Sequence, residues 1–376
     1  MNKLGLLCGL TIAAASSFAA PQNAAPAAAS KPAASPTPAI AVYRWGAANP
    51  SGGAAANEAF AQWLNQPVVW GEDFTPTERW ENCIEGGGWQ LGEWSKWKKA
   101  VPGRRLIISI PLLPGGWNRG GIKGSDGKYN NPVSFEAGAR GDYNEHFKNL
   151  AENLIKYGLE DSVIRLGWEF NGGWYTWRAS DNIPGFIGYW RQIVTTMRAV
   201  PGAEKLQYCW NPAQGWLQFP AEQAWPGDEY VDIVGLDFYD QSWAKNTYPW
   251  PENATPEEIE ARQRQAVDNV LIGGKEGLKQ WSDFALKHNK PFALPEWGLC
   301  KRGDKHGGLD NPYFIEQVHK FINNPANHVA FHCYFDVEAG DGGHQLSPGF
   351  RGNAHESVFP KSAAKFKQLF SGTGAK

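Results

Sequence analysis

The stretch VIRLGWEFNGGWYTW, residues 163–177, joins a short apolar run to one acidic side chain, Glu169, and then to glycines and aromatics. An apolar run of this length that stops at glycine and asparagine is typical of a buried β-strand followed by a loop. Successive strand residues point to opposite sides, so Arg165 and Glu169 are expected on one face and Trp168 and Phe170 on the other. The stretch therefore predicts a strand that ends in a carboxylate.

Similar runs recur along the chain, and helical patterns lie between them. Residues 143–157 and 184–200 each place apolar side chains on one stripe, a capping box at Thr255 and Glu258 opens a helix, and Asn311 with Pro312 opens another. Strands and helices that alternate in this way predict a (β/α)8 TIM barrel, formed by a single catalytic domain at residues 39–370. The eight expected strands are residues 39–45, 67–70, 105–111, 163–168, 206–210, 231–238, 291–295 and 329–335.

The two ends of the chain differ in composition from this domain. Residues 1–19 have the basic start, apolar run and small residues of an export signal, residues 20–38 form an Ala/Pro-rich linker, and residues 371–376 are expected to be a flexible tail. No later stretch approaches the roughly 18 unbroken apolar residues of a membrane span. A secreted or periplasmic protein, monomeric and not held by a membrane after signal cleavage, is the expectation.

Composition narrows the class of ligand. The formal net charge of -2 offers no basic field for nucleic acid or an anionic membrane. The 19 tryptophans favour a carbohydrate ligand, because flat aromatic rings stack on the C–H faces of sugars. Four cysteines remain after signal cleavage, and a disulfide between two of them stays open: Cys83, Cys209, Cys300 and Cys333. Neither the cysteines nor the scattered histidines have metal-ligand spacing, so no metal or organic cofactor is expected.

Functional residues of such barrels lie at the C-terminal ends of the strands. The acids near those ends are Glu72, Asp73, Glu169, Asp237, Asp240, Glu296, Asp336 and Glu338. Strand alternation turns Glu169 toward the barrel axis and puts Leu294 and Glu296 on one face, with Pro295 between them marking an irregular strand end. Two glutamates converging on one pocket can hydrolyse a glycosidic bond; a purely structural pair of acids is the alternative.

Three motifs make the prediction more specific. WEFNGGWYTW at residues 168–177, YVDIVGLDFYD at 230–240 and LPEWGL at 294–299 resemble clan A glycoside hydrolases, and most closely glycoside hydrolase family 26. The resemblance implies a (β/α)8 barrel with Glu169 as general acid/base and Glu296 as nucleophile of a retaining double displacement. It further implies that Tyr239 hydrogen-bonds the nucleophile and that Trp174 and Trp177 floor the sugar subsites.

The chain departs from the family immediately before the acid/base. Family 26 usually has histidine there, and many related families have asparagine that contacts the sugar 2-hydroxyl, whereas this chain has Trp168. The family's substrates, β-mannans, β-1,3-xylan and mixed-linkage β-glucans, are therefore only the first candidates, and Trp168 itself is counted among the substrate-binding residues.

Further residues are candidates for the sugar site. Arg165 could line the site or pair with an acid inside the barrel, Asn211 could bind a hydroxyl or form a turn, and Asp237 could touch substrate. Tryptophans near strand ends could serve as sugar platforms, with Trp297 preferred: Trp45, Trp70, Trp117, Trp210, Trp216, Trp243 and Trp297. The sequence thus predicts an endo-acting enzyme that cleaves a β-linked polysaccharide. A transglycosylase that processes an exopolysaccharide, or a non-catalytic carbohydrate-binding barrel, remains possible.

Overall fold

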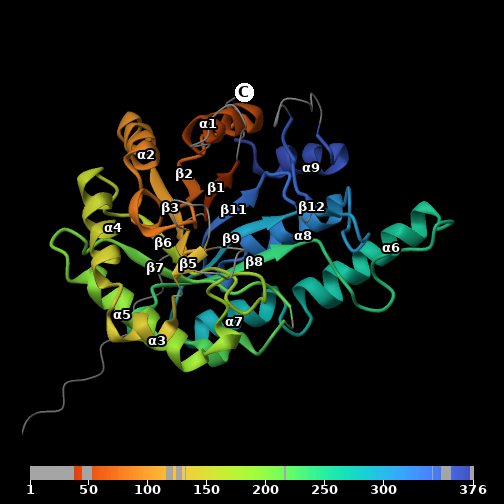
Figure 1. The fold of residues 1–376 in the computed structure, drawn as a ribbon. Coiled ribbons are helices and arrows are strands. Elements are labelled where there is room, and N and C mark those ends of the chain that lie inside the picture. The colour runs from red at the N-terminus through yellow and green to blue at the C-terminus, as the bar shows by residue number, and fades with distance from the viewer. Residues whose placement is uncertain are drawn as a thin grey trace, which may run out of the picture. The chain divides into compact units, whose positions relative to one another are not determined.

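Eight parallel strands close into a barrel in the order in which they occur along the chain (Figure 1). The first strand pairs with both the second and the last, which removes any open sheet edge. The barrel strands are β1 (Ala39–Tyr43), β2 (Trp70–Phe74), β3 (Arg105–Ile110), β6 (Val163–Leu166), β7 (Gln207–Trp210), β8 (Ile233–Tyr239), β9 (Phe292–Gly298) and β11 (Val329–Phe335). The predicted (β/α)8 barrel is confirmed.

This computed structural model describes residues 38–44, 53–115, 122–123, 129–131, 133–215, 217–340, 342–348 and 357–372. The described residues all fall within one compact unit, Pro36–Lys376. The predicted export signal, all but the last residue of the predicted linker, and residues 373–376 of the predicted tail lie outside the described residues. None of the helices in the described part of the chain combines the length and apolar character that crossing a bilayer requires.

Helices pack around the outside of the barrel (Figure 1). They are α1 (Gly53–Leu64), α2 (Gly88–Ala100), α3 (Phe135–Arg140), α4 (Asn144–Lys156), α5 (Ile183–Arg198), α6 (Pro256–Ala266), α7 (Leu278–Lys287), α8 (Pro312–Ile322) and α9 (Pro360–Phe370). Short turns of other helix types are η1 (Trp80–Ile84), η2 (Ala179–Asp181), η3 (Ala221–Ala224), η4 (Asp228–Tyr230), η5 (Val267–Ile272) and η6 (Pro325–Asn327). The predicted capping box at Thr255 is present, and Asn311 caps α8 by accepting a hydrogen bond from the Phe314 amide.

Strand alternation sorts the side chains into an outer and an inner set. Outward residues join the helices in one large apolar core. At the base of the barrel, apolar residues from seven of the eight strands point inward, two of them from β11: Ala41, Ile107, Val163, Cys209, Ile233, Ala293, Phe331 and Cys333. Toward the C-terminal strand ends this apolar layer gives way to charged side chains, so the site is built on a filled barrel base.

Two strands differ from the prediction in ways that affect the site. The second strand is β2 and not residues 67–70, because Trp70 to Phe74 pair with β3; Glu72 and Asp73 therefore lie within a strand and do not follow it. Along β9 the register against β8 shifts, so that Gly235 faces Ala293 but Asp237 faces Glu296. This extra residue overturns the expectation that Leu294 and Glu296 share a face, since Leu294 belongs to the outer core.

Two small antiparallel sheets lie outside the barrel: β10 (Lys301–Arg302) pairs with β12 (Gly342–Gly343), and β4 (Ile122–Lys123) pairs with β5 (Tyr129–Asn131). Cys83, Cys209, Cys300 and Cys333 are all buried free thiols. The disulfide that the sequence left open is therefore not formed among these four described cysteines.

Candidate active site

Glu169 lies just beyond the end of β6, where the backbone leaves the strand conformation. Both Gly167 and Glu169 have a φ of 53°, in the left-handed region that non-glycine residues rarely adopt. A Cβ at position 167 would lie 1.5 Å from Leu112 Cδ1, so glycine is required there. The Glu169 amide donates a hydrogen bond of 2.8 Å to the Asn211 carbonyl at the end of β7. The neighbouring strand thus fixes the backbone of the half-buried glutamate.

Glu296 projects from β9 and is held by two strong donors. The Tyr239 hydroxyl donates to Glu296 Oε2 at 2.5 Å, and Arg165 Nη2 lies 2.6 Å from Glu296 Oε1. Burial, together with the Glu296 carboxylate, raises the pKa of Tyr239 well above its ordinary value, so the tyrosine stays a hydrogen-bond donor at neutral pH. The contact that the resemblance implied between Tyr239 and Glu296 is present.

Arg165 is fully buried and connects five of the barrel strands. Nη1 donates to Glu72 Oε1 at 3.1 Å and to Ser109 Oγ at 3.0 Å, and Nε donates to Asn211 Oδ1 at 3.1 Å. Nη2 contacts Asp237 as well as Glu296. Of the two readings that the sequence left open, the structure supports an arginine paired with acids inside the barrel.

The ionisation of this cluster follows from its burial. Burial by itself lowers the pKa of Arg165. The neighbouring carboxylates outweigh burial and raise this pKa well above its ordinary value, so the guanidinium stays charged; they belong to Asp237, Glu296 and Glu72. Burial raises the pKa of Glu72 to about 7 against the opposing effect of Arg165. Burial also raises the pKa of Asp237 well above its ordinary value, again opposed by Arg165. Protonation of Glu72 brings the cluster closer to neutrality, as a buried charge network requires.

Three carboxyl groups meet above the guanidinium. Each of Glu169, Asp237 and Glu296 contributes one carboxylate oxygen, and these three oxygens all lie within 4.8 Å of one another. Such a group could in principle hold a metal ion, but the Arg165 guanidinium already contacts Asp237 and Glu296 and supplies the balancing positive charge. The arrangement therefore fits paired carboxyl chemistry on an organic substrate.

Trp174 covers the exposed side of Glu169. Its indole Nε1 donates to Glu169 Oε2 at 2.9 Å, and its ring packs over Gly172, where a Cβ would come within 2.4 Å of the indole. Glycine at position 172 therefore lets the half-buried ring reach the carboxylate. Trp174 thus lies beside Glu169, and its role as a floor of the sugar subsites stays a prediction.

A continuous row of rings, here called the aromatic arc, borders the carboxyl cluster. It consists of Tyr239, Phe335, Tyr43, Phe74 and Trp168, and neighbouring ring centroids are 5.8, 5.3, 4.6 and 5.1 Å apart in that order. The Arg165 guanidinium lies 5.4 Å from the Phe74 ring and 5.6 Å from the Trp168 ring. An apolar border of this kind excludes water and strengthens electrostatic interactions among the acids.

Trp168 turns its polar edge away from the acids. Its indole Nε1 donates to the Tyr175 hydroxyl at 3.0 Å, and the Tyr175 ring stacks on Trp177 with centroids 4.4 Å apart. Trp168 contacts Phe74 of the aromatic arc, and it lies with Phe170 in the large apolar core, as strand alternation predicted for both residues.

Several predicted binding residues lie in the interior and cannot contact a sugar. Trp177 is fully buried and donates its Nε1 to the Trp168 carbonyl. Trp297 is also fully buried, against α9, because it neighbours the inward Glu296 on the strand and must point outward. Asn211 is fully buried; it accepts from Arg165 and donates to the Pro212 carbonyl, so it positions the cluster.

The other proposed sugar platforms divide by location. Trp210 is buried against α7, and Trp70 lies at the start of β2, on the opposite end of the barrel. Trp45, Trp117 and Trp216 lie outside the described residues. Trp243 is 58% exposed in the loop that follows β8.

The sequence named Glu72 only as an acid near a strand end, and it did not point to Ser109 or to the apolar members of the aromatic arc. Alternation along β2 would have turned Glu72 inward had that strand been placed at its observed position. The arc could not be found locally, because its rings come from four different strands and from the turn that follows β6.

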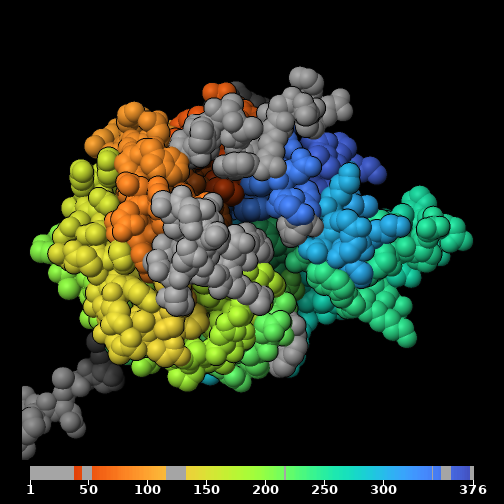
Figure 2. Space-filling view, in the orientation of Figure 1, coloured from red at the N-terminus to blue at the C-terminus, as the bar shows by residue number. Residues whose placement is uncertain are grey.

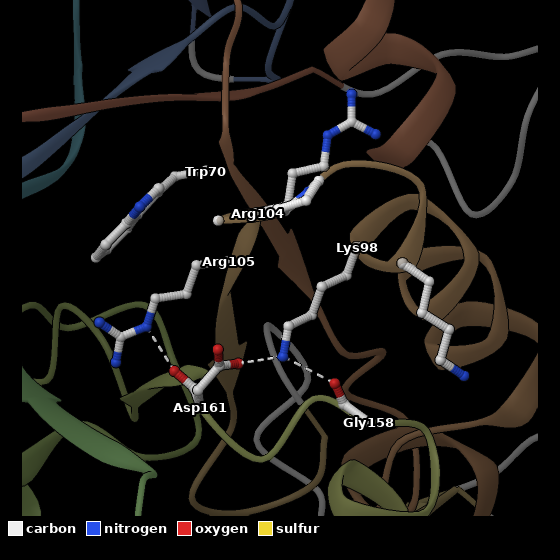
Figure 3. A pocket seen from close by; sticks show the side chains of 9 residues that line it. Trp70, Lys98, Arg104, Arg105, Gly158 and Asp161 are labelled. Atoms are coloured by element: carbon white, nitrogen blue, oxygen red, sulfur yellow. Dashed lines mark hydrogen bonds and ion pairs between the residues drawn. The ribbon is translucent and has the colours of Figure 1, made fainter.

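A hollow lies at the N-terminal end of the barrel, opposite the candidate active site (Figure 3). It has a volume of about 480 Å³ and is lined by Trp70, Lys98, Lys99, Arg104, Arg105 and Asp161 among others. Lys98 and Arg105 converge on Asp161: Lys98 Nζ contacts its Oδ1 at 2.6 Å, and Arg105 Nε donates to its carbonyl at 2.5 Å. Lys98 is thus paired with a carboxylate and Arg105 is held by hydrogen bonds, and the N-terminal barrel end is associated with stability.

Comparison with known proteins agrees with the architecture. The family model for glycosyl hydrolase family 26 matches residues 134–255. A mannan endo-1,4-beta-mannosidase of Bifidobacterium adolescentis is 23% identical over 350 residues, covering 88% of this chain and 30% of that protein. The chain thus spans less than a third of that relative's length.

Solved structures match the fold. The YdhT protein from Bacillus subtilis has a TM-score of 0.54 at 17% identity, with 80% of this chain and 81% of that chain covered. The catalytic domain of a GH26 endo-beta-1,4-mannanase from Bacillus sp. JAMB-750 has a TM-score of 0.51 at 16% identity, with 83% and 81% covered.

The closed barrel and these matches support a glycosidase of clan A. Within that class the chain is similar to glycoside hydrolase family 26, and two of its three motifs, at residues 168–177 and 230–240, lie in the segment that the family model matches.

Proposed function

We propose that this protein is an exported, retaining glycoside hydrolase that cleaves a β-linked polysaccharide by attack within the chain. The observation that carries the proposal is the convergence of Glu169 and Glu296, whose nearest carboxylate oxygens lie within 4.8 Å. Retaining enzymes hold their two carboxyl groups about 5 to 5.5 Å apart, whereas inverting enzymes leave about 6.5 to 9.5 Å for a water molecule. The short separation favours retention.

The surroundings of the two glutamates favour distinct roles. Glu296 is anchored by the Arg165 guanidinium and by the Tyr239 hydroxyl, which orient its carboxylate for attack on the anomeric carbon. Glu169 is half-buried and open to the ligand, so it protonates the leaving glycosidic oxygen as Glu296 forms a bond to the sugar. In the second step Glu169 takes a proton from water, and that water releases the sugar from Glu296.

The substrate proposal rests on the relatives. Two of the similar proteins are described as β-1,4-mannanases, which makes β-mannan the first candidate. Export is supported by the pattern of residues 1–19. A transglycosylase would use the same two glutamates and differ in whether a sugar hydroxyl or water accepts the glycosyl group.

The test is a screen of the protein against plant, algal and bacterial polysaccharides, with product size and product anomer recorded. We expect rapid loss of polymer length and products that keep the anomeric configuration of the substrate. Glu296→Gln should lower turnover on the order of 10³-fold or more with unchanged circular dichroism. Inverted products would exclude the double displacement, and a fully active Glu296→Gln would exclude the nucleophile.

A further inference from the structure

Trp243 is an exposed aromatic residue close to the candidate catalytic residues. It is 58% exposed, more than any other large apolar side chain in the described residues. It follows Tyr239, the partner of Glu296, by four residues, which span roughly 14 Å at most. The backbone of Trp243 therefore lies on the C-terminal side of the barrel, no more than roughly 14 Å from that of Tyr239.

Backbone contacts with the loop after β9 anchor the segment that carries this ring. The Ser242 amide donates to the His306 carbonyl at 3.0 Å, and the Gly308 amide donates to the Asp240 carbonyl at 2.8 Å. Gln241 forms an antiparallel bridge with Gly307. The segments that carry these residues lie next to each other in the space-filling view, in green and cyan (Figure 2). A ring that is already ordered loses little conformational entropy when a ligand binds.

Polar groups surround the indole while most of it stays open. The His306 ring stacks on it with centroids 5.2 Å apart and an interplanar angle of 15°, and the Arg302 guanidinium lies 5.2 Å from its centroid. Arg302 in turn bonds Asp304 and donates to Gln241 Oε1 at 3.1 Å. A flat apolar face beside hydrogen-bonding groups matches a pyranose ring, which presents C–H groups on its face and hydroxyls at its edge.

We propose that Trp243, supported by His306, is the platform of an outer sugar-binding subsite on the β8 and β9 side of the active site. The inference rests on the proposed function and sharpens it: the substrate is a polysaccharide whose chain continues past the sugars at the scissile bond. A small glycoside would leave this platform empty.

The test compares Trp243→Ala with Trp89→Ala, a second exposed tryptophan, which starts α2 and is 47% exposed. On the best polysaccharide from the screen, Trp243→Ala should lower kcat/KM about tenfold, mainly through KM. The loss should be several times smaller on an aryl glycoside with a single sugar. Trp89→Ala should leave both values near those of the parent protein, and melting temperatures should be unchanged in both variants.

A second measurement removes catalysis from the test. In the Glu296→Gln background, retardation of the protein in gels containing the polysaccharide should weaken when Trp243 is replaced by alanine. The subsite would be overturned if replacing Trp243 changed neither polysaccharide cleavage nor retardation. It would also be overturned if Trp89→Ala lowered kcat/KM on polysaccharide as much as Trp243→Ala. A parent protein that cleaves no polysaccharide but is retarded through Trp243 would support the subsite and overturn the hydrolase.

Discussion

Arg165 and Glu296 lie 2.6 Å apart inside the barrel, joined through Arg165 Nη2 and Glu296 Oε1. The same guanidinium also binds Glu72 and Asp237, so the candidate nucleophile is held from below by a network that spans the sheet. Stability and catalysis are therefore coupled at one side chain.

Arg165→Lys should lower both stability and turnover. A lysine keeps the positive charge but cannot reproduce the planar set of donors that serves Glu72, Ser109, Asn211 and the acids. Loss of these buried contacts should reduce the free energy of unfolding by about 3 kcal/mol. Urea denaturation and initial rates check this, with Arg178→Lys as control, because Arg178 pairs with the more exposed Asp181 and should change stability by less than about 1 kcal/mol.

Glu169→Ala should separate substrates by their leaving groups. The departing sugar of a polysaccharide leaves through a hydroxyl oxygen that must be protonated. Turnover of polysaccharide should therefore fall about 10² to 10⁴-fold. An aryl glycoside with an acidic phenol needs no proton and should keep much of its rate in the first step. The values of kcat/KM on both substrates measure this ratio, because they report the first step and not the second step, in which Glu169 acts as base. An equal loss of kcat/KM on both would rule out the acid role of Glu169.

Glu72→Gln should flatten the dependence of stability on pH. The pKa of Glu72 is raised from 4.5 to about 7 in the folded protein, so between these values the native state keeps a proton that the unfolded chain has lost. The contribution of Glu72 to the free energy of unfolding is greatest below pH 4.5, and it is lost as the pH rises through 7. Melting temperatures from about pH 5 to pH 8 should fall less in the variant than in the parent protein, with the exposed Glu93→Gln as the matched control. A slope identical to that of the parent would refute the assignment.

The effect should be partial, because other buried acids titrate in the same direction, among them Asp237 in the same cluster, Asp73 and Asp240. Burial raises the pKa of Asp73 to about 6 and that of Asp240 to about 7. Neither is paired with a cation in the described residues: Trp94 donates to Asp73, and Tyr248 and Asn311 donate to Asp240.

Trp297→Ala should act on stability, whereas Trp174→Ala should act on catalysis. Trp297 is fully buried against α9, so its truncation should cost about 3 to 5 kcal/mol. Trp174 is half-buried beside Glu169, and its loss should lower kcat with a much smaller change in melting temperature. Differential scanning fluorimetry and steady-state kinetics distinguish the two, and a stable Trp297→Ala with a raised KM would reverse our correction.

The sequence was sufficient to predict the barrel, because eight short apolar runs with helices between them leave few other arrangements. It also predicted where Glu169 and Glu296 would converge. It missed the position of β2, since WGEDF contains two acids and the neighbouring residues 67–70 carry the apolar signal. Arg165 and Ser109, from two other strands, bond the inward Glu72, and a local pattern cannot show these partners.

The tryptophans show a second limit. Trp297 could have been excluded as a platform from alternation alone, since its neighbour Glu296 points inward. Trp177 could not, because the turn after Glu169 is set by the left-handed backbone at positions 167 and 169 and by the packing of Leu112. Side-chain direction past a strand end depends on such contacts.

The indole N–H of Trp174, bonded to Glu169 at 2.9 Å, has a use of its own. A proton on that nitrogen gives a separate signal in magnetic resonance spectra, and its frequency depends on whether the bonded carboxyl group is charged. The candidate proton donor therefore carries a built-in reporter, through which its ionisation can be followed in the intact protein and compared before and after a sugar binds.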